Sequence, residues 1–356
     1  MTKTIRTAIA GYGKIGQRRK EVMEEHGGYE VIAVCDIRYP AEGTMLSDGT
    51  AAYQTYEKLL ELDIDALMVC LPNDVAADVV VAALKRGLHV FCEKPPGREV
   101  ADIEKVIVAE RAAPGLKLKY GFNHRYHDSV IEALDIVQSG KFGKLLNMRG
   151  VYGKSAFIPW PRPTATGSDK DDRAQWRTSR AIAGGGILLD QGIHMVDLML
   201  TFAGGPFSDV KSFVSNDFWK QDVEDNAYAL MRNDDGVVAF LHSTATQWRH
   251  KFNLEIFLEN GALQLTGILS GSKSYGEEKL TITPRVDKAN GQPSETTESF
   301  IFDDSWAREM AEFADCVAND KPVEVGTSGQ ALDSMKTVYA IYQADARWAE
   351  YMNAPA

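Results

Sequence analysis

The chain has 356 residues, 44% of them hydrophobic and 25% charged, and its 39 lysines and arginines against 50 aspartates and glutamates give a net charge of −11. This average composition excludes disordered, collagen-like and low-complexity chains, and the length predicts two domains. The acidic balance argues against nucleic acid as a partner, because phosphate-backbone binding needs a basic surface.

The N-terminal apolar run 5–10 is too short for a signal peptide, and Gly11 interrupts it. No apolar run reaches the roughly 18 residues that a membrane span needs. The cysteines are Cys35, Cys70, Cys92 and Cys316. They lack metal-type spacing, and we interpret the first three as small buried apolar residues. We therefore expect a cytoplasmic protein with no membrane segment and no metal site.

Residues 1–122 alternate between strand and helix patterns. The predicted strands are short and apolar, as in a parallel sheet buried on both faces; they are 5–10, 30–36, 66–71, 89–92 and 118–121. The predicted helices between them are 15–25, 56–62, 75–86 and 101–112. Repeated strand–helix units predict a doubly wound α/β domain of the Rossmann type.

Residues 123–356 form the second predicted domain, of the α+β class. A helix is expected over 128–139, and Gly184-Gly185-Gly186 opens an amphipathic helix that ends near residue 202. From 208 to 302 strands dominate, and Asn260-Gly261 is a hairpin signal within an antiparallel sheet. Two more helices are expected, over about 306–317 and 329–351.

The first motif is G-x-G-x-x-G directly between a predicted strand and a predicted helix, which is the context of a dinucleotide-binding turn. Its residues are Gly11, Tyr12, Gly13, Lys14, Ile15 and Gly16. Asp36 ends the second strand, where an acid meets the ribose hydroxyls of NAD. Arg38 lies two residues on and could pair with the 2′-phosphate of NADP, so NAD is favoured and NADP stays possible.

Two further motifs carry candidate catalytic residues. Glu93-Lys94-Pro95 follows a strand and therefore lies at the carboxyl edge of the sheet, where ligands bind; an ordinary surface lysine is the alternative. Asp190, His194 and Asp197 share one helix face beside an apolar stripe. A substrate-binding carboxylate beside a general base, a metal pair and a purely structural helix face remain open from spacing alone.

Together these motifs resemble the glucose–fructose oxidoreductase/inositol dehydrogenase superfamily (Gfo/Idh/MocA) over nearly the whole chain. The resemblance rests on 11–16, Cys70-Leu71-Pro72-Asn73, Glu93-Lys94-Pro95-Pro96, Gly121-Phe122-Asn123-His124-Arg125-Tyr126, Trp176-Arg177, and Gly184-Gly185-Gly186 with Asp190, His194 and Asp197. The chain departs from many relatives at Ala76, where they often carry a histidine, and at Pro96, where they carry Leu or Met.

The resemblance implies a Rossmann domain joined to a C-terminal domain with a large open-faced antiparallel sheet, through which many relatives form dimers or tetramers. It implies an NAD(P)-dependent oxidoreductase acting on a sugar, polyol or sugar nucleotide. Lys94 would be the catalytic lysine, and Asp190 and His194 would complete the catalytic set. Leu71, Pro72, Asn73 and Glu93 would join the cofactor site, and Asn123, Arg125, Tyr126, Trp176 and Arg177 are candidate substrate contacts.

In the expected mechanism His194 removes a hydroxyl proton, Lys94 hydrogen-bonds to the reacting oxygen, and Asp190 holds a neighbouring hydroxyl. Two other functions stay open. One is an NAD-dependent glycosidase, which keeps its cofactor bound and produces no net NADH. The other is a non-catalytic sugar or NAD sensor, against which the presence of all three catalytic residues argues.

Overall fold

The computed structural model of the chain describes residues 4–155, 176–269, 274–286 and 294–353. The chain divides into two compact units. Unit 1 comprises Met1–Asn123 and Asp304–Leu332, and unit 2 comprises His124–Asp303 and Asp333–Ala356. The sequence pattern predicts one second domain over residues 123–356, whereas the structure assigns the segment 304–332 to unit 1.

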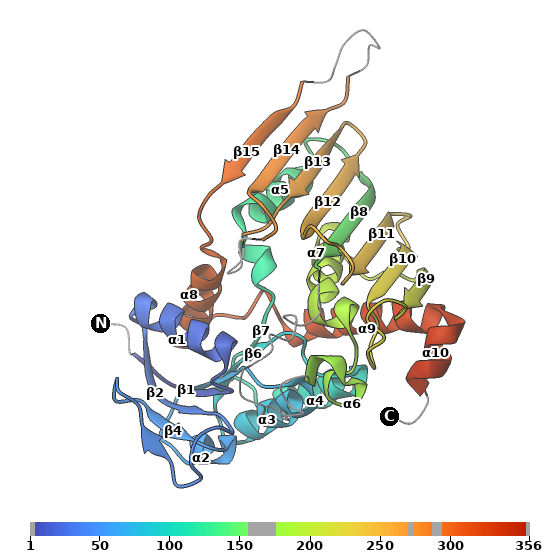
Figure 1. The fold of residues 1–356 in the computed structure, drawn as a ribbon. Helices are drawn as coiled ribbons and strands as arrows, with labels where there is room; N and C mark the ends of the chain where they lie inside the picture. Colours follow the sequence, from blue (N-terminus) through green and yellow to red (C-terminus); the bar gives the residue numbers. More distant parts are fainter. Residues whose placement is uncertain (1–3, 156–175, 270–273, 287–293, 354–356) are drawn as a thin grey trace. The chain divides into compact units, whose positions relative to one another are not determined.

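Unit 1 is built on a seven-stranded sheet with the order β3-β4-β2-β1-β5-β6-β7 (Figure 1). Its strands are β1 (Ile5–Ala10), β2 (Tyr29–Cys35), β3 (Thr44–Met45), β4 (Ala51–Tyr53), β5 (Ala66–Val69), β6 (His89–Glu93) and β7 (Leu118–Gly121). All neighbours are parallel except β3 and β4. The chain order reverses on either side of β1, which creates the crevice where ligands bind in such sheets. The predicted doubly wound parallel sheet is confirmed.

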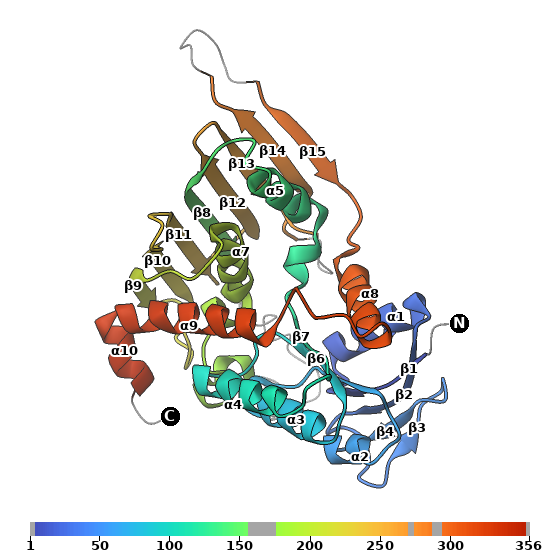
Figure 2. The same cartoon turned by 180° about the vertical axis from the view of Figure 1, so that it is seen from behind.

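The helices of unit 1 lie on both faces of this sheet (Figure 2). They are α1 (Lys14–His26), α2 (Tyr56–Leu60), α3 (Asn73–Lys85), α4 (Val100–Arg111) and α8 (Ser305–Ala318). All predicted strands and helices up to residue 122 are present, with ends within two residues of the observed ones, whereas the short β3 and β4 were not predicted. Helix α8 joins this unit because its Met310 and Phe313 pack into the same core as Met23 and Phe91.

Unit 2 contains an eight-stranded sheet with the order β15-β14-β13-β12-β8-β11-β10-β9 (Figure 1). Its strands are β8 (Leu145–Gly153), β9 (Asp209–Ser215), β10 (Asn226–Arg232), β11 (Val238–Thr244), β12 (Lys251–Leu258), β13 (Gly261–Thr266), β14 (Glu278–Pro284) and β15 (Thr296–Phe300). The predicted antiparallel sheet is confirmed with one exception, since β8 and β11 pair in parallel. The predicted Asn260-Gly261 hairpin joins β12 and β13.

The two faces of the unit 2 sheet differ. One face packs against α5 (Asp128–Gln138), α7 (Ile193–Ala203) and α9 (Ser328–Ala344), as Figure 2 shows. Close packing of α7 on β8 depends on Gly150, because a Cβ there would lie 2.5 Å from Met199 Cε. Exposed apolar side chains occupy β9, β10 and β11, namely Phe213, Tyr228, Leu230 and Phe240. Because these residues alternate with buried ones, they lie on the opposite, open face.

The helix predicted over 329–351 is two helices, α9 and α10 (Ala346–Asn353). The break falls at Asp345, whose carboxylate accepts hydrogen bonds from the backbone N–H groups of Arg347 (3.0 Å), Trp348 (3.2 Å) and Val214 (2.8 Å). A side chain that satisfies free N–H groups is a helix-starting signal, which explains the interruption.

One helical stretch in the described residues, Arg180–Ala203, is long and apolar enough to cross a membrane by length and composition alone. Its apolar window is 78% buried inside the structure, which is what the core helix of a folded domain shows.

Candidate active site

The Gly11–Gly16 turn has the geometry of a dinucleotide-binding loop. Gly11 has a φ of +94°, and a Cβ there would lie 2.3 Å from the carbonyl oxygen of Cys70. A Cβ at Gly16 would lie 2.1 Å from the carbonyl oxygen of Gly11 and 3.3 Å from the side chain of Ile9. A Cβ at Gly13 would meet no atom within 4 Å, so only this glycine faces open space at the start of α1. Two glycines therefore serve packing, and Gly13 leaves room for a phosphate at the helix N-terminus.

Asp36 stands directly after β2, as predicted, and is held by Arg38. The Arg38 side chain donates to Asp36 from Nε (2.7 Å) and Nη2 (3.0 Å), and Nη2 also donates to the carbonyl oxygen of Tyr12 (3.0 Å). Burial disfavours the charged carboxylate, but hydrogen bonds from Arg38 outweigh burial and lower the pKa of Asp36. Asp36 is therefore ionised at neutral pH, and Arg38 braces both the acid and the glycine turn.

Glu93 is the last residue of β6, and Lys94 follows it. A buried arginine holds the Glu93 carboxylate in place by a hydrogen bond. Arg19 of α1 is fully buried and donates to Glu93 Oε1 from Nε (2.7 Å) and to Glu309 Oε2 from Nη2 (2.7 Å). Its guanidinium carbon also lies 4.4 Å from the ring centre of Phe91. Glu309 comes from α8, so the segment 304–332 helps to fix the residue that precedes Lys94. Neither Arg19 nor Glu309 was predicted, because no motif links residues this far apart in the chain.

The other predicted residues of unit 1 lie at the same edge of its sheet. Leu71 and Pro72 connect β5 to α3, and Asn73 is the first residue of that helix. Asn123 is buried, and its side-chain amide donates to Ser305 Oγ at 3.2 Å. The loops after β1, β5 and β6 thus meet at the carboxyl edge, as expected for an open parallel sheet.

In unit 2 the helix predicted from Gly184 to residue 202 is interrupted. Gly184 ends the short α6 (Arg180–Ala183), a π-helical turn covers Leu188–Gly192, and α7 follows. Asp190 lies in the π-helical turn, and π-helical turns often occur at functional sites. The predicted apolar stripe is buried as expected; it consists of Leu189, Ile193, Val196 and Leu200.

Asp190 and His194 have well-defined surroundings. The Asp190 carboxylate lies 3.2 Å from Lys154 Nζ and 3.5 Å from Arg177 Nε, with 15% of its side chain exposed. His194 is buried and stacks on His124, with ring centres 3.8 Å apart and planes 9° from parallel. His124 Nε2 in turn lies 3.0 Å from the hydroxyl of Tyr152. Lys154, His124 and Tyr152 belong to this cluster and were not predicted as site residues.

The glycine run 184–186 makes room for a buried glutamate, Glu224. Glu224 accepts hydrogen bonds from the N–H groups of Gly186 (2.6 Å) and Leu188 (2.9 Å) and from the hydroxyl of Tyr342 (2.7 Å). A Cβ at Gly186 would lie 2.2 Å from the carbonyl oxygen of Glu224. Burial raises the pKa of Glu224 to about 7, although these hydrogen bonds oppose the shift. The run therefore lets Glu224 hold the turn that carries Asp190.

The remaining predicted substrate contacts differ in their partners within the protein. Arg125 donates from Nε to Asp197 at 2.7 Å, and Asp197 is fully buried, so this pair stabilises α7. Tyr126 is buried. Arg177 lies over the ring of Trp176 at 4.4 Å and approaches Asp190, so Arg177 belongs to the same cluster and Trp176 packs against it. Among the described residues, no group of three His, Cys, Asp or Glu side chains could hold a metal ion.

Comparisons with known proteins agree with this architecture. Residues 5–121 match the oxidoreductase family with an NAD-binding Rossmann fold (GFO/IDH/MocA), and residues 130–264 match the GFO/IDH/MocA C-terminal domain. A putative UDP-kanosamine synthase oxidoreductase subunit from Amycolatopsis mediterranei is 31% identical over 68% of each chain. Inositol 2-dehydrogenase from Salmonella typhimurium is 28% identical over 59% of this chain, and the match spans 58% of that enzyme's length.

Solved structures share the fold. Levoglucosan dehydrogenase in complex with NADH has a TM-score of 0.80 at 18% identity and covers 97% of this chain and 98% of its own. A 3-ketoreductase from Actinomadura kijaniata in complex with NADP and TDP-benzene has a TM-score of 0.77 at 21% identity, with coverage of 96% and 98%. With both domains matched in order, the chain belongs to the GFO/IDH/MocA oxidoreductase family and has an NAD-binding Rossmann domain.

Proposed function

We propose that this protein is an NAD(P)-dependent oxidoreductase that transfers hydride between a nicotinamide and a hydroxyl or carbonyl carbon of a sugar, polyol or sugar nucleotide. The observation that carries the proposal lies in unit 1. Gly13 leaves open space at the start of α1, and Lys94 follows β6 at the same edge of the parallel sheet. That edge is where a dinucleotide and its substrate bind in open α/β sheets.

The residues fit NAD at three points: the open Gly13, the ionised Asp36, and the free N-terminus of α1. We propose NAD as the preferred cofactor, because the Asp36 carboxylate suits ribose hydroxyls and repels a 2′-phosphate. When bound, the nicotinamide accepts or donates the hydride. Arg38 is already engaged by Asp36 and the Tyr12 carbonyl oxygen, which supports a bracing role over phosphate binding.

The chain's own residues then handle the proton and the substrate oxygen. In the oxidation direction His194 accepts the hydroxyl proton while the carbon-bound hydrogen leaves as hydride, so the alcohol becomes a carbonyl. Lys94 donates a hydrogen bond to the reacting oxygen and stabilises its developing negative charge. Asp190, held by Lys154, binds a neighbouring hydroxyl. Stacking on His124 fixes the ring of His194, and a fixed base lowers the cost of orienting the reactants.

The test is a panel of sugars, polyols and nucleotide sugars scored for NADH formation, with variants at the two proposed catalytic residues. Lys94→Met should lower the rate about a hundredfold, since one electrostatic donor is worth about 3 kcal/mol. His194→Ala should lower the rate by about 10² to 10⁴. The His194 defect should shrink at high pH, where hydroxide replaces the base, and the Lys94 defect should persist.

Lys85→Met at the end of α3 and His26→Ala at the end of α1 are the matched controls and should keep full activity. Normal turnover in either catalytic variant would contradict the role given to that residue. Cleavage of a glycoside without net formation of NADH would show that the protein is a glycosidase and not a dehydrogenase.

We also propose that the protein is a homodimer or homotetramer. An open sheet face with large exposed apolar side chains is commonly covered by symmetric self-association, and Phe213 is 79% exposed. Light scattering at micromolar concentration should give a multiple of the 39.3 kDa chain mass, and Leu230→Glu should shift the protein towards monomer. A monomeric mass for the unmodified protein would contradict this proposal.

A further inference from the structure

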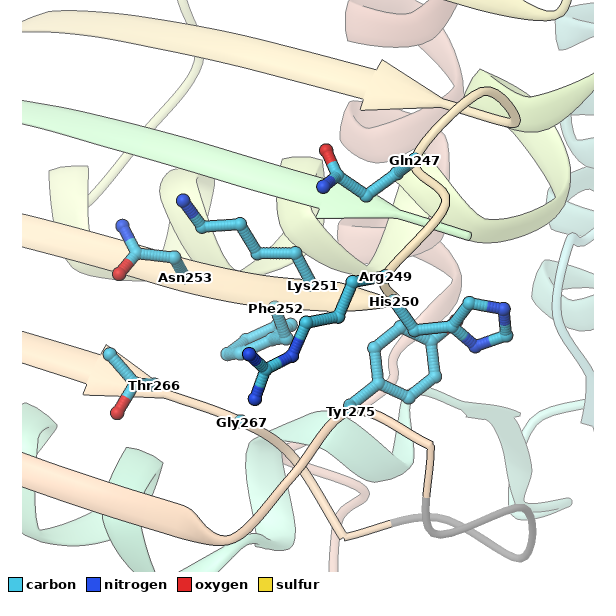
Figure 3. A pocket seen from close by; sticks show the side chains of 9 residues that line it. All are labelled: Gln247, Arg249, His250, Lys251, Phe252, Asn253, Thr266, Gly267 and Tyr275. Atoms are coloured by element: carbon cyan, nitrogen blue, oxygen red, sulfur yellow. The ribbon is translucent and has the colours of Figure 1, made fainter. Parts of the chain in front are cut away.

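Unit 2 contains a pocket of about 350 Å³ at the start of β12, and Figure 3 shows its lining. The lining residues are Gln247, Arg249, His250, Lys251, Phe252, Asn253, Thr266, Gly267 and Tyr275. Its volume falls within the range of small-ligand sites, which begins at about 300 Å³. Polar side chains and two aromatic rings share the walls, as in sites that bind a ligand with both a charged part and a carbon skeleton.

The charge of this pocket contrasts with that of the whole protein. The net charge of the chain is −11, yet the nine lining residues include Arg249 and Lys251 and no aspartate or glutamate. Within the described ranges of the chain, neither cation has a carboxylate within ion-pair distance. Most other cations on this sheet are paired, such as Arg149 with Glu255 and Lys279 with Glu277. Two unneutralised cations in one concave site favour a negatively charged ligand.

His250 connects this pocket to the proposed catalytic cluster of the same unit. Its Nε2 lies 3.0 Å from Ser155 Oγ, and its Nδ1 lies 2.7 Å from Ser274 Oγ. Burial and the positive charge of Lys154 lower the pKa of His250. Lys154 also contacts Asp190, and the N–H of Gln247 donates to the carbonyl oxygen of Lys154 at 3.0 Å. Lys154 thus links Gln247, in the wall of the pocket, to Asp190.

Tyr275 makes a second connection. Its ring centre lies 5.3 Å from that of His250 and 5.3 Å from that of Tyr152, which contacts His124. Burial, together with the negative charge of Asp190, raises the pKa of Tyr275 to about 12, so its hydroxyl stays protonated. A ligand in the pocket would therefore lie against Tyr275, whose ring packs on Tyr152, the partner of His124.

We propose that this pocket binds an oxyanion carried by the sugar substrate, either a phosphate or a carboxylate, through Arg249 and Lys251. The planar guanidinium of arginine matches two oxygens of such a group, and lysine adds a second point of positive charge. The inference deepens the proposed function, on which it rests, because it assigns the substrate to the anionic sugars. It makes Arg249 and Lys251 specificity-determining residues that take no part in proton or hydride transfer.

The experiment is calorimetric binding to the full chain at low ionic strength, with four probes: uridine diphosphate, glucose 1-phosphate, glucuronate and glucose. At least one anionic probe should bind ten times more tightly than glucose. Arg249→Met and Lys251→Met should each weaken that probe about tenfold, the scale of one charge-assisted hydrogen bond. Both side chains are exposed, so these variants should fold normally. Arg249→Lys should bind the probe more tightly than Arg249→Met, because lysine keeps the positive charge but lacks the planar guanidinium that binds two oxygens at once.

Lys211→Met is the matched control. It removes the same charge from β9, an edge strand that β8, β11 and β10 separate from β12, and should change binding less than twofold. Preference for glucose 1-phosphate or uridine diphosphate identifies a phosphate, and preference for glucuronate identifies a carboxylate. Equal binding of glucose and all anions, or unchanged binding in both variants, would overturn the inference. Binding without turnover of any sugar would instead count against the proposed function, because these titrations need no catalysis.

Discussion

Each unit carries a glycine run ahead of a helix that bears proposed functional residues, and the two runs do different things. In unit 1 a Cβ at Gly13 would enter open space, so the run leaves a place for a ligand. In unit 2 a Cβ at Gly185 would lie 2.3 Å from the hydroxyl of Tyr342, and one at Gly186 would meet Glu224. The first run is open to a cofactor, whereas the second is filled by the protein itself. Glycines near a site therefore indicate that some group lies close to the backbone, but they do not show whether that group is a ligand or another part of the protein.

The largest expected effect comes from crowding the filled run. Gly186→Ala should lower the free energy of unfolding by about 3 kcal/mol, the upper range for overpacking, because the nearest atom is a backbone carbonyl oxygen, which cannot rotate away. Urea denaturation would measure the change. Gly205→Ala, where an added Cβ meets nothing within 4 Å, is the control and should stay within about 0.5 kcal/mol. Equal stability of both variants would show that the Glu224 contact has been misplaced.

A smaller effect should appear when the charge of Glu224 changes with pH. The pKa of Glu224 is raised to about 7 in the folded protein, against about 4.5 for the free side chain. Folding therefore favours the neutral form, whose stabilising contribution is complete below about pH 4.5 and is lost as pH rises through about 7. Between pH 5 and pH 8 the loss should be on the order of 2 kcal/mol.

Denaturation at pH 5 and pH 8 of the unmodified protein and of Glu224→Gln would measure this loss. The stability of the unmodified protein should fall relative to that of the variant as pH rises. A parallel pH dependence in the two proteins would mean that Glu224 is ionised throughout this range.

Unit 1 was predictable almost element by element because its strands are short apolar runs buried on both faces, and each is followed by a helix signal. Unit 2 was less predictable. Strand β8 contains Asn147, Arg149 and Gly150, which break the apolar pattern, yet it is the strand that pairs with both β11 and β12. Its place follows from long-range packing with α7, which a local pattern does not contain.

The candidate site divides in the same way. Residues within motifs, such as Gly13 and Lys94, could be named from the sequence because chemistry and spacing coincide there. Arg19 holds Glu93, which precedes Lys94, whereas Glu224 and Lys154 hold the turn that carries Asp190. These three supporting residues come from distant segments, and none belongs to a motif. Arg125 stays a predicted substrate contact, and the structure adds its ion pair with the buried Asp197, which the sequence alone does not reveal. Supporting residues depend on tertiary contacts, and so they appear only with the fold.

A calorimetric titration of NAD and NADP into the unmodified protein and into Gly13→Ala tests most directly whether the open glycine turn of unit 1 binds the cofactor. The φ of −77° at Gly13 is accessible to alanine, and the added Cβ meets no protein atom, so folding should be unaffected. Our expectation is that NAD binds more tightly than NADP, and that Gly13→Ala weakens NAD binding at least about tenfold, or roughly 1.4 kcal/mol, with an unchanged unfolding midpoint. Undiminished NAD binding by Gly13→Ala, or tighter binding of NADP, would contradict it.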